Sequence, residues 1–287
     1  MQPAPTSPAG RGPAASIPAA SIGVQLRNWR QMRRRSQLDL ALEAGISQRH
    51  LSYVESGRAA PSRAMVLNLA EHLEVPLRDR NALLLAAGFA PRYPQRRLDD
   101  PALQSTRALL DAILRGHAPH PALAVDRHWI MVAANAAVPP LLAGVTDAAL
   151  LRPPVNVLRL SLHPGGLAPA IANLPAWRAH VLARLRRQAQ ANGDPELRRL
   201  LAELAALGPG GDDGASAPGM DEIAVPLELD TSEGRLSLIS TTAVFGTAAE
   251  VVVSELAIEA FYPADRATAD RLARLQRPRL QRPQQGR

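Results

Sequence analysis

Apolar residues in the first part of the chain recur every three or four positions, which is the spacing of one face of an α-helix. The pattern opens with Ile22, Leu26 and Trp29 and is broken by residue types that start or end helices, such as Ser36 and Gly45. We therefore expect five helices here, over residues 22–32, 37–44 and 48–56, then from Ser62 and from Pro76.

The second and third predicted helices are separated only by a short turn around Gly45, which is the arrangement of a helix-turn-helix unit. Leu51 and Val54 would face the core of this small domain, because they lie on one side of the third helix. The outer face of that helix then carries Gln48, Arg49, Ser52 and Tyr53. Side chains of these types hydrogen-bond to base edges or to phosphates.

Three stretches resemble the phage-repressor-like, or XRE-type, helix-turn-helix domains: SQLDLALEAGIS, the LSYVESGR that follows, and the APS that leads into a helix ending NLAEHLEV. The resemblance implies that Gln37 touches phosphate at the start of the second helix. It also implies that the outward-facing residues of the third helix enter the major groove of double-stranded DNA. Inside the domain, it implies an ion pair between Arg30 and Glu55.

The chemistry of the exposed side chains divides them into two groups. Gln48 and Arg49 are the predicted specificity residues, because glutamine pairs with adenine and arginine with guanine. Phosphate contacts position a domain without reading sequence, and we assign them to Gln37, Arg33, Arg34, Arg35 and Arg58. On charge alone the run from Arg33 to Arg35 would be a solvated basic face, but its place beside Gln37 favours the phosphate role.

From about residue 101 the pattern changes to a mixture of helices and strands. One helix is expected over 101–116, and two short apolar runs around Asp126 and Arg127 predict a hairpin that leads into a helix near Asn135. Further helices are predicted over 176–192 and 195–207. After a glycine-rich loop at 208–219, three β-like runs at 222–229, 235–245 and 250–262 are expected to pair as antiparallel neighbours.

The order of five segments in this part resembles the ligand-binding half of MmyB-like transcription regulators: NVLRLSLHPGGLAP, PAWRAHVLARLR, DPELRRLLAEL, GRLSLISTTAVFGT and SELAIEAFYPADRATADRLARL. Together with the helix-turn-helix, the resemblance spans residues 22–275. It implies a PAS-like domain that senses a small hydrophobic ligand, with fatty acids as one candidate class. The residues themselves indicate an aliphatic domain that could enclose an apolar cavity or be filled.

The predicted fold class is α+β with two domains: an all-α five-helix DNA-binding domain, then a PAS-like domain with an antiparallel sheet and flanking helices. The predicted boundaries are a disordered tail at 1–20, the helix-turn-helix domain at 21–90, a linker at 91–100, the ligand-binding domain at 101–275 and a disordered tail at 276–287. The tails are rich in proline and polar residues and contain too little apolar surface to offset the entropy of ordering.

Five residues of the second domain are candidates for ligand contact: Trp129, Asn135, Arg159, His163 and Phe245. Arg159 suits an anionic head group because a guanidinium donates two parallel hydrogen bonds, and His163 could bind a carboxylate. Each residue also has a structural explanation. Trp129 and Phe245 would pack in the core, Asn135 would cap a helix, Arg159 would form a surface ion pair and His163 would be held in its loop.

Composition limits the remaining function classes. Lys and Arg number 33 against 26 Asp and Glu, and the net charge of +7 agrees with a nucleic-acid partner. The absence of cysteine excludes a disulfide scaffold and thiolate metal sites. Neither a targeting signal nor a run of about 18 apolar residues is evident, so we expect a cytoplasmic protein without a membrane partner.

Motifs of the common enzyme classes are absent from the sequence, so we expect no enzyme. His117 and His120 form an HxxH pair, but prolines place the pair in a loop and no nearby carboxylate completes a metal site. We therefore expect no metal and no cofactor apart from the small hydrophobic ligand.

These observations predict a one-component, sequence-specific transcriptional regulator that acts as a homodimer. Dimerisation is expected because one recognition helix reads only a few base pairs, so two half-sites are needed for useful specificity. Two alternatives are open from the sequence. One is an antitoxin-like or other protein-interaction module with a DNA-binding domain, and the other is a DNA-bound enzyme with an unrecognised site.

Overall fold

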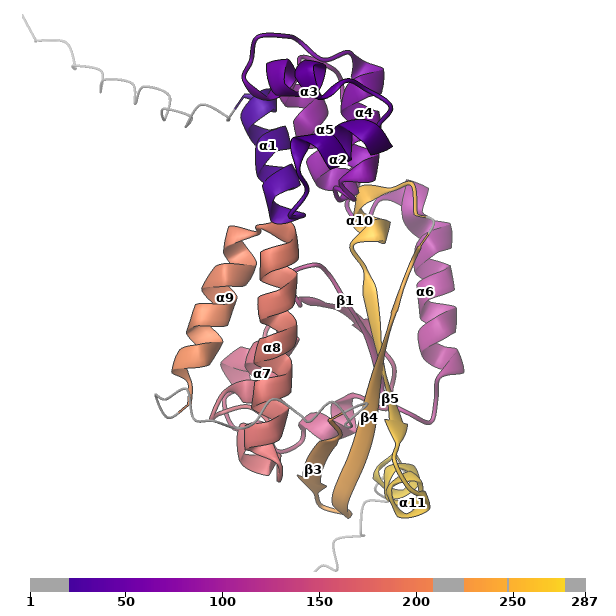
Figure 1. The fold of residues 1–287 in the computed structure, drawn as a ribbon. Coiled ribbons are helices and arrows are strands. Elements are labelled where there is room, and N and C mark those ends of the chain that lie inside the picture. Colours follow the sequence, from indigo (N-terminus) through magenta and orange to yellow (C-terminus); the bar gives the residue numbers. More distant parts are fainter. Residues whose placement is uncertain (1–20, 209–224, 247, 277–287) are drawn as a thin grey trace, which may run out of the picture. The chain divides into compact units, whose positions relative to one another are not determined.

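The computed structural model describes residues 21–208, 225–246 and 248–276 (Figure 1). Within these ranges the chain forms two compact units, one of residues 21–75 and 79–91, the other of residues 76–78 and 92 onward. The predicted tails at 1–20 and 276–287 and the predicted loop at 208–219 lie, apart from Gly208 and Gln276, outside the described residues. In the part of the chain that is described, no helix is both long and apolar enough to cross a membrane.

The first unit contains the five predicted helices. They are α1 (Ile22–Met32), α2 (Gln37–Glu43), α3 (Gln48–Glu55), α4 (Arg63–His72) and α5 (Leu77–Ala86). Ser36, Ser47 and Ser62 cap α2, α3 and α4, and each hydroxyl accepts a hydrogen bond from the backbone N–H three residues later. At α2 the bond is reciprocated by the Asp39 carboxylate, which completes a capping box.

A leucine-rich core joins these helices. Its fully buried members are Leu26, Leu40, Leu51, Leu69, Leu73, Leu83 and Leu84. Helix α1 packs directly on the end of α3, because Gly23 faces the last turn of that helix. A Cβ atom at this position would lie 2.4 Å from the carbonyl oxygen of Val54, which is closer than non-bonded atoms approach. The orientation of α3 therefore depends on the absence of a side chain at residue 23.

The second unit is built on one five-stranded antiparallel sheet with the order β2-β1-β5-β4-β3. The strands are β1 (Ala122–Val125), β2 (Met131–Ala134), β3 (Leu227–Thr231), β4 (Gly234–Val244) and β5 (Ala257–Pro263). The helices are α6 (Gln104–Gly116), α7 (Val157–Leu162), α8 (Leu174–Asn192), α9 (Pro195–Ala206), α10 (Val251–Ser254) and α11 (Arg266–Leu275). Short 3-10 turns lie at Pro101–Leu103, Pro139–Leu142, Ala148–Leu151 and Ala168–Ala170.

Helices cover both faces of this sheet (Figure 1). Side chains along each strand alternate between the two faces. On one face Ala122, Ala124 and Ile258 pack with Leu110 and Leu114 of α6. On the other face a larger core gathers residues of α7, α8 and α9 against the remaining side chains of the strands.

The α+β class, the hairpin and the antiparallel pairing of the last three strands are confirmed, and the PAS-like comparison stays a prediction. The prediction of one β run over 250–262 is wrong at its start, where α10 precedes β5. At residues 250 and 251 the hydrogen bonds go to a segment outside the sheet instead of to a neighbouring strand. The Val251 N–H donates to the carbonyl of Pro94, and the Glu250 carboxylate accepts from Arg96. The helix predicted near Asn135 is also wrong, since only the 3-10 turn at 139–142 follows β2. Helices α7 and α11 were not predicted.

Replacement of Gly23 by alanine tests the close approach of α1 and α3. The added methyl group has to displace the backbone of Val54 and Glu55, so we expect Gly23→Ala to lower the free energy of unfolding by about 1–3 kcal/mol. Chemical denaturation of the full chain measures this change. Gly116→Ala is the matched control, because Gly116 is also helical and a Cβ atom added there would meet no other atom within 4 Å. Equal stability of the two variants would contradict the close approach.

Candidate functional site

Helix α3 presents polar side chains on the surface of the first unit. It begins after Ser47, which fixes the first turn by accepting from the His50 N–H at 3.1 Å. Gln48 and Arg49 are exposed, and Ser52 and Tyr53 are half-buried. The four predicted base- or phosphate-contacting residues of this helix are therefore accessible.

Tyr53 brings two of the predicted DNA-contacting arginines together. Its hydroxyl accepts a hydrogen bond from Nε of Arg49 at 3.0 Å, and the Arg49 guanidinium lies 5.4 Å from the ring centroid. The guanidinium of Arg58 lies 5.9 Å from the same ring. A rigid aromatic ring with two such contacts restricts the rotamers of both long side chains. Tyr53 thus orders the charged groups at the end of α3.

The carboxylate of Glu55 is bound from two other helices. Oε1 accepts from Nε of Arg30 at 2.7 Å, and Oε2 accepts from Arg30 Nη2 at 2.8 Å and from Nε2 of Gln37 at 2.8 Å. Burial alone would raise the pKa of Glu55, but the bonds from Arg30 and Gln37 outweigh burial and hold this pKa below its usual range. The predicted ion pair between Arg30 and Glu55 is present, and Gln37 donates a further hydrogen bond to the same carboxylate.

The basic run after α1 does not form a single face. Arg33 donates to the carbonyls of Leu73 and Glu74 at 2.9 and 3.1 Å, where it caps the end of α4. Arg34 has a φ of 53° and ends α1 in a Schellman motif, with its own N–H bonded to Gln31 and the next N–H bonded to the carbonyl of Arg30. Arg35 pairs with Glu43. The Arg33 guanidinium thus has a helix-capping contact within the domain, and its phosphate role stays a prediction, while the side chain of Arg34 is exposed.

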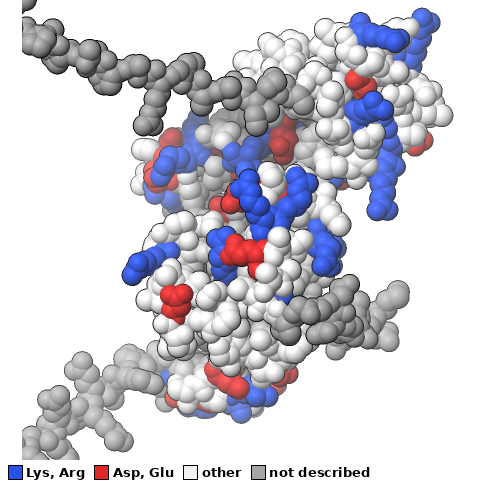
Figure 2. Space-filling view, turned by 90° about the vertical axis from the view of Figure 1, so that its left-hand side faces the viewer, with Lys and Arg blue, Asp and Glu red and all other residues white. Residues whose placement is uncertain are grey.

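On the face that Figure 2 shows, positive charge does not form a continuous patch. In Figure 2 arginines are interspersed with acidic side chains, and much of that face is uncharged. The net positive charge alone therefore does not mark a binding surface, and α3 is distinguished by the types of side chain that it exposes.

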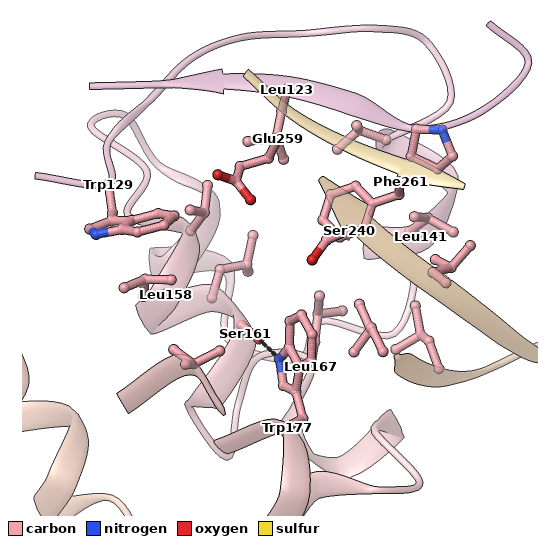
Figure 3. A pocket seen from close by; sticks show the side chains of 18 of the residues that line it. Leu123, Trp129, Leu141, Leu158, Ser161, Leu167, Trp177, Ser240, Glu259 and Phe261 are labelled. Atoms are coloured by element: carbon pink, nitrogen blue, oxygen red, sulfur yellow. Dashed lines mark hydrogen bonds between the residues drawn. The ribbon is translucent and has the colours of Figure 1, made fainter. Parts of the chain in front are cut away.

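The second unit contains an apolar cavity of about 110 Å³ between the sheet and helices α7 and α8 (Figure 3). For comparison, an apolar protein cavity of roughly 150 Å³ binds a molecule the size of benzene. The apolar lining consists of Pro121, Leu123, Trp129, Met131, Val138, Leu141, Leu142, Val157, Leu158, Leu160, Leu167, Trp177, Val181, Leu227, Leu229, Leu238 and Phe261. The cavity is therefore suited to a small hydrophobic molecule or to part of a larger one.

Polar groups also line this cavity. They are Ser161, His180, Arg184, Ser240 and Glu259. Arg184 and Glu259 form an ion pair with two hydrogen bonds, at 2.7 and 3.0 Å. Ser161 accepts from the indole N–H of Trp177 at 2.9 Å, and His180 stacks on the same indole. An apolar cavity with a few polar groups on its wall is typical of small-molecule sites.

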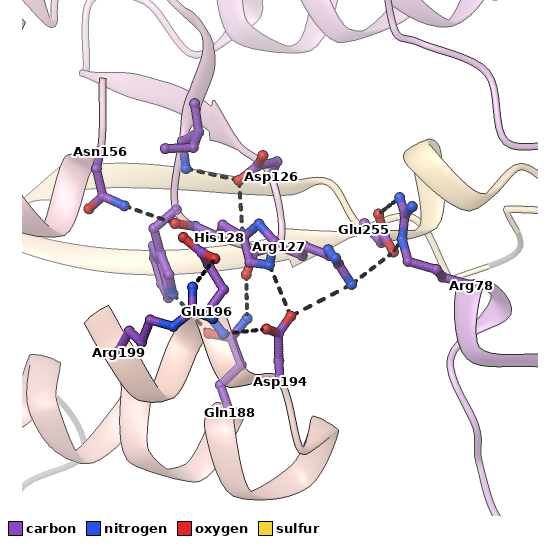
Figure 4. A network of polar contacts seen from close by, with 12 residues as sticks. Arg78, Asp126, Arg127, His128, Asn156, Gln188, Asp194, Glu196, Arg199 and Glu255 are labelled. Atoms are coloured by element: carbon purple, nitrogen blue, oxygen red, sulfur yellow. Dashed lines mark hydrogen bonds and ion pairs between the residues drawn. The ribbon is translucent and has the colours of Figure 1, made fainter. Parts of the chain in front are cut away.

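Trp129 of the cavity wall lies in the turn between β1 and β2. Figure 4 shows the polar contacts of this turn. Asp126 accepts from the backbone N–H groups of His128 and Ile130, which closes the turn. His128 binds Asp194 at 2.9 Å, and the indole N–H of Trp129 donates to Gln188 at 2.8 Å. The turn is thus held against α8 and the start of α9, although Trp129 itself has a φ of 66°.

The Asp194 carboxylate is charged where it holds this turn. Burial would raise its pKa, but hydrogen bonds from His128 and from the backbone N–H of Glu196 outweigh burial and lower it. Arg127 adds a positive charge 3.6 Å away. Asp194 is also the N-cap of α9, so a single carboxylate links the hairpin turn to the start of that helix.

Of the five predicted ligand residues, the structure brings only Trp129 to the apolar cavity. Asn135 is buried and bonds to backbone groups of Leu114, His120, Ala122 and Ala137. Phe245 packs on the α6 side of the sheet, and His163 accepts from the Gly165 N–H within its loop. Arg159 forms two hydrogen bonds with Glu203 and borders a second, smaller cavity of about 90 Å³. The structural explanations considered for Arg159, His163 and Phe245 match their observed contacts, whereas Asn135 caps no following helix because none begins there.

The polar residues of the cavity were missed from the sequence. Glu259 had a recognisable signal, because it is a charged residue within a predicted strand run rich in apolar side chains. Arg184 and His180 lie four residues apart on a helix, but so do many solvated pairs, and their common cavity follows only from the fold.

His117 and His120 lie beside Tyr262 as an aromatic group, and Nε2 of His117 is 3.1 Å from the carbonyl oxygen of Phe261. Over residues 21–208, 225–246 and 248–276, no cluster of three or more His, Cys, Asp or Glu side chains forms a candidate metal site. The predictions of no metal and no cofactor remain predictions.

Two family models match the chain. Residues 106–275 match the MmyB-like transcription regulator ligand binding domain, and residues 26–79 match a helix-turn-helix family. The first match covers more than half of the sequence. No curated protein matches the chain.

The stability of the first unit should depend on the charge of Glu55. Glu55→Gln leaves Arg30 buried without its partner, and we expect a loss of about 3–5 kcal/mol in the free energy of unfolding at neutral pH. The folded pKa lies below 4.5, the ordinary value, so the stabilisation is complete above about pH 4.5 and is lost as the pH falls through the folded pKa.

Denaturation of the full chain between neutral and acid pH, followed by circular dichroism, measures both effects. The variant should lose less stability on acidification than the unmodified protein. Glu71→Gln, at an exposed position of α4, is the matched control and should follow the unmodified protein. An identical acid response of Glu55→Gln and the unmodified chain would contradict the assignment.

Proposed function

The chain belongs to the MmyB-like transcription regulators, and we propose that it is a one-component regulator in which a small hydrophobic ligand controls sequence-specific DNA binding. Its two matched regions make it a DNA-binding transcription regulator with a ligand-binding carboxy-terminal domain. Both are regulatory domains, which favours a protein without enzymatic activity. In our proposal it acts in the cytoplasm.

The exposed surface of α3 supports direct reading of base edges. Gln48 and Arg49 are accessible near the amino-terminal end of the helix, where a recognition helix contacts bases. We assign phosphate contacts to Arg34, Arg58, Ser52 and Gln37, and we assign to Tyr53 the positioning of Arg49. Arg33 is left out of this surface because its guanidinium caps α4.

The apolar cavity is the single observation that carries the sensing half of the proposal. Two tryptophans and many leucines and valines line the cavity, so transfer of an aliphatic chain from water into the cavity is favourable. In fatty-acid-like molecules the chain would occupy this space. Ligand binding changes DNA affinity only if the ligand prefers one of two arrangements of the protein.

A homodimer is part of the proposal, because one α3 helix reads only a few base pairs. Two copies on half-sites about one helical turn apart would supply the specificity that a regulator requires. This step rests on the geometry of DNA recognition.

DNA reading is tested by fluorescence anisotropy with duplex from the region upstream of the protein's own gene and a scrambled duplex as competitor. Gln48→Ala and Arg49→Ala should each weaken specific binding by about 1–3 kcal/mol, because each removes a base-edge contact. Circular dichroism should stay unchanged, since both side chains are exposed.

The matched control is Gln31→Ala, which removes the same amide from an exposed position of α1. It should retain full affinity. Equal affinity of the unmodified protein for both duplexes would contradict the regulator and favour an antitoxin-like interaction module. Unchanged site preference in both α3 variants would show that another surface reads the bases.

Filling the cavity should abolish ligand binding. Val181→Phe adds a ring from α8 into the cavity, and we expect native mass spectrometry of the full chain to show the loss of a bound hydrophobic molecule. Val132→Phe is the control, because Val132 is exposed on β2 and outside the cavity wall. Equal occupancy in the two variants would place the ligand elsewhere, and conversion of the molecule to a product would favour an enzyme.

A further inference from the structure

We propose that the carboxylate of a fatty-acid-like ligand binds beside His180 and Ser161 in the apolar cavity and that His180 takes up one proton as the ligand binds. This inference rests on the proposed ligand-binding function and specifies how the cavity holds the head group. Its basis is the state of the polar side chains in the cavity wall, some of which bind each other while others have bonds left to make.

Among the described residues of the cavity wall, Arg184 and Glu259 carry a permanent charge, and they bind each other. Glu259 is only 7% exposed, and its carboxylate accepts from Arg184 at 2.7 and 3.0 Å and from the Thr242 hydroxyl at 3.0 Å. The Arg184 guanidinium also lies over the Trp129 ring, with 4.5 Å between its central carbon and the centroid. Taking Arg184 away would leave Glu259 buried without its partner, which is costly. The head group is therefore received by other side chains.

His180 has unused hydrogen-bonding capacity in the same wall. It lies on α8, one turn before Arg184, and is half-buried. Its ring stacks on the indole of Trp177 with 5.7 Å between the centroids, and no described residue hydrogen-bonds to either of its nitrogens. An imidazole in this state can bond to a polar group inside the cavity.

Ser161 of α7 bonds to the same indole. Its oxygen accepts from Nε1 of Trp177 at 2.9 Å (Figure 3), and its own O–H donates to no described residue. His180 and Ser161 therefore lie beside one tryptophan and can supply two donors. Two donors suit the two oxygens of a carboxylate.

A carboxylate adds no net charge to the cavity if a proton accompanies it. The charges of Arg184 and Glu259 cancel, so a further negative charge would be uncompensated, and burying such a charge is costly. Burial lowers the pKa of His180, and the positive charges of Arg184 and Arg187 lower it further, while Glu259 acts in the opposite direction. The ring is therefore uncharged at neutral pH before the ligand binds. A carboxylate beside the ring favours the imidazolium, and the proton comes from the solvent.

The direction of the pH dependence follows from this change. Without ligand the pKa of His180 lies below its ordinary value of 6.5, and the bound carboxylate raises it. Between these two pKa values each binding event takes up one proton, so the affinity falls about tenfold for each unit of rising pH. Above the pKa of the complex this contribution to binding is lost.

The test is isothermal titration calorimetry of the full-length protein with octanoate and with octanol, which share one chain and differ in the head group. Titrations at about pH 7.5 in phosphate and in Tris, which differ in ionisation enthalpy, give the number of protons taken up. We expect about one proton for octanoate and none for octanol. Octanoate binding without proton uptake overturns the proposal.

Replacement of His180 assigns the proton to this side chain. His180→Gln keeps a hydrogen-bonding group that cannot be protonated, so it should weaken octanoate binding at least about tenfold and abolish the proton uptake. His72→Gln is the matched control, because His72 lies on α4 and outside the cavity wall. Proton uptake that persists in a folded His180→Gln variant contradicts the role of His180.

Two serine variants locate the head group within the cavity. Ser161→Ala removes the second donor and should weaken octanoate binding by about two- to tenfold, with proton uptake retained because His180 is present. Ser240→Ala removes a hydroxyl from the β4 side of the same wall and should leave the affinity unchanged. A larger loss in Ser240→Ala than in Ser161→Ala overturns the assigned position.

Failure of this inference is distinct from failure of the proposed function. If neither molecule binds, or if Val181→Phe binds both as tightly as the unmodified protein, the ligand cavity itself is contradicted. Binding of octanol without binding of octanoate contradicts only the head-group site. The proton count of the unmodified protein tests the proposal alone, so a variant that fails to fold does not remove the test.

Discussion

The second unit depends on a sheet that is buried on both faces. Strands β1 and β5 lie at its centre, so consecutive residues serve two different interiors. Under α6 these residues are small, as at Ala122 and Ala124, and the helix lies close to the strands. On the other face larger side chains hold α7 and α8 away from the sheet, which leaves space for the cavity.

The two units use the same device for different purposes. Each contains a buried glutamate bound twice by one arginine and once by a neutral side chain, Gln37 for Glu55 and Thr242 for Glu259. In the first unit the pair fixes the helix that carries the exposed polar surface. In the second unit the pair lies in the wall of the apolar cavity.

Local sequence signals predicted the elements well, because serine caps and glycine terminators act within a few residues. They predicted the hairpin at Asp126 for the same reason. They failed at Val251, whose β-branched neighbours indicate a strand, while its N–H bonds to Pro94 far away in the sequence. The capping contact of Arg33 was missed because the helix that it caps lies far along the chain. The Arg184–Glu259 pair was missed because only the packing of α8 on β5 brings its members together.

The amide of Asn135 adds polar bonds among elements that already pack together, namely α6, β1 and the segment after β2. Its oxygen accepts from the backbone of Ala122 and Ala137, and its nitrogen donates to the carbonyls of Leu114 and His120. One side chain therefore ties the last turn of α6 to the start of β1 and to the end of β2. A slip of β1 by one residue would break the bond from Ala122, and neither aspartate, which lacks the donors, nor leucine, which lacks both functions, could form the full set of four bonds.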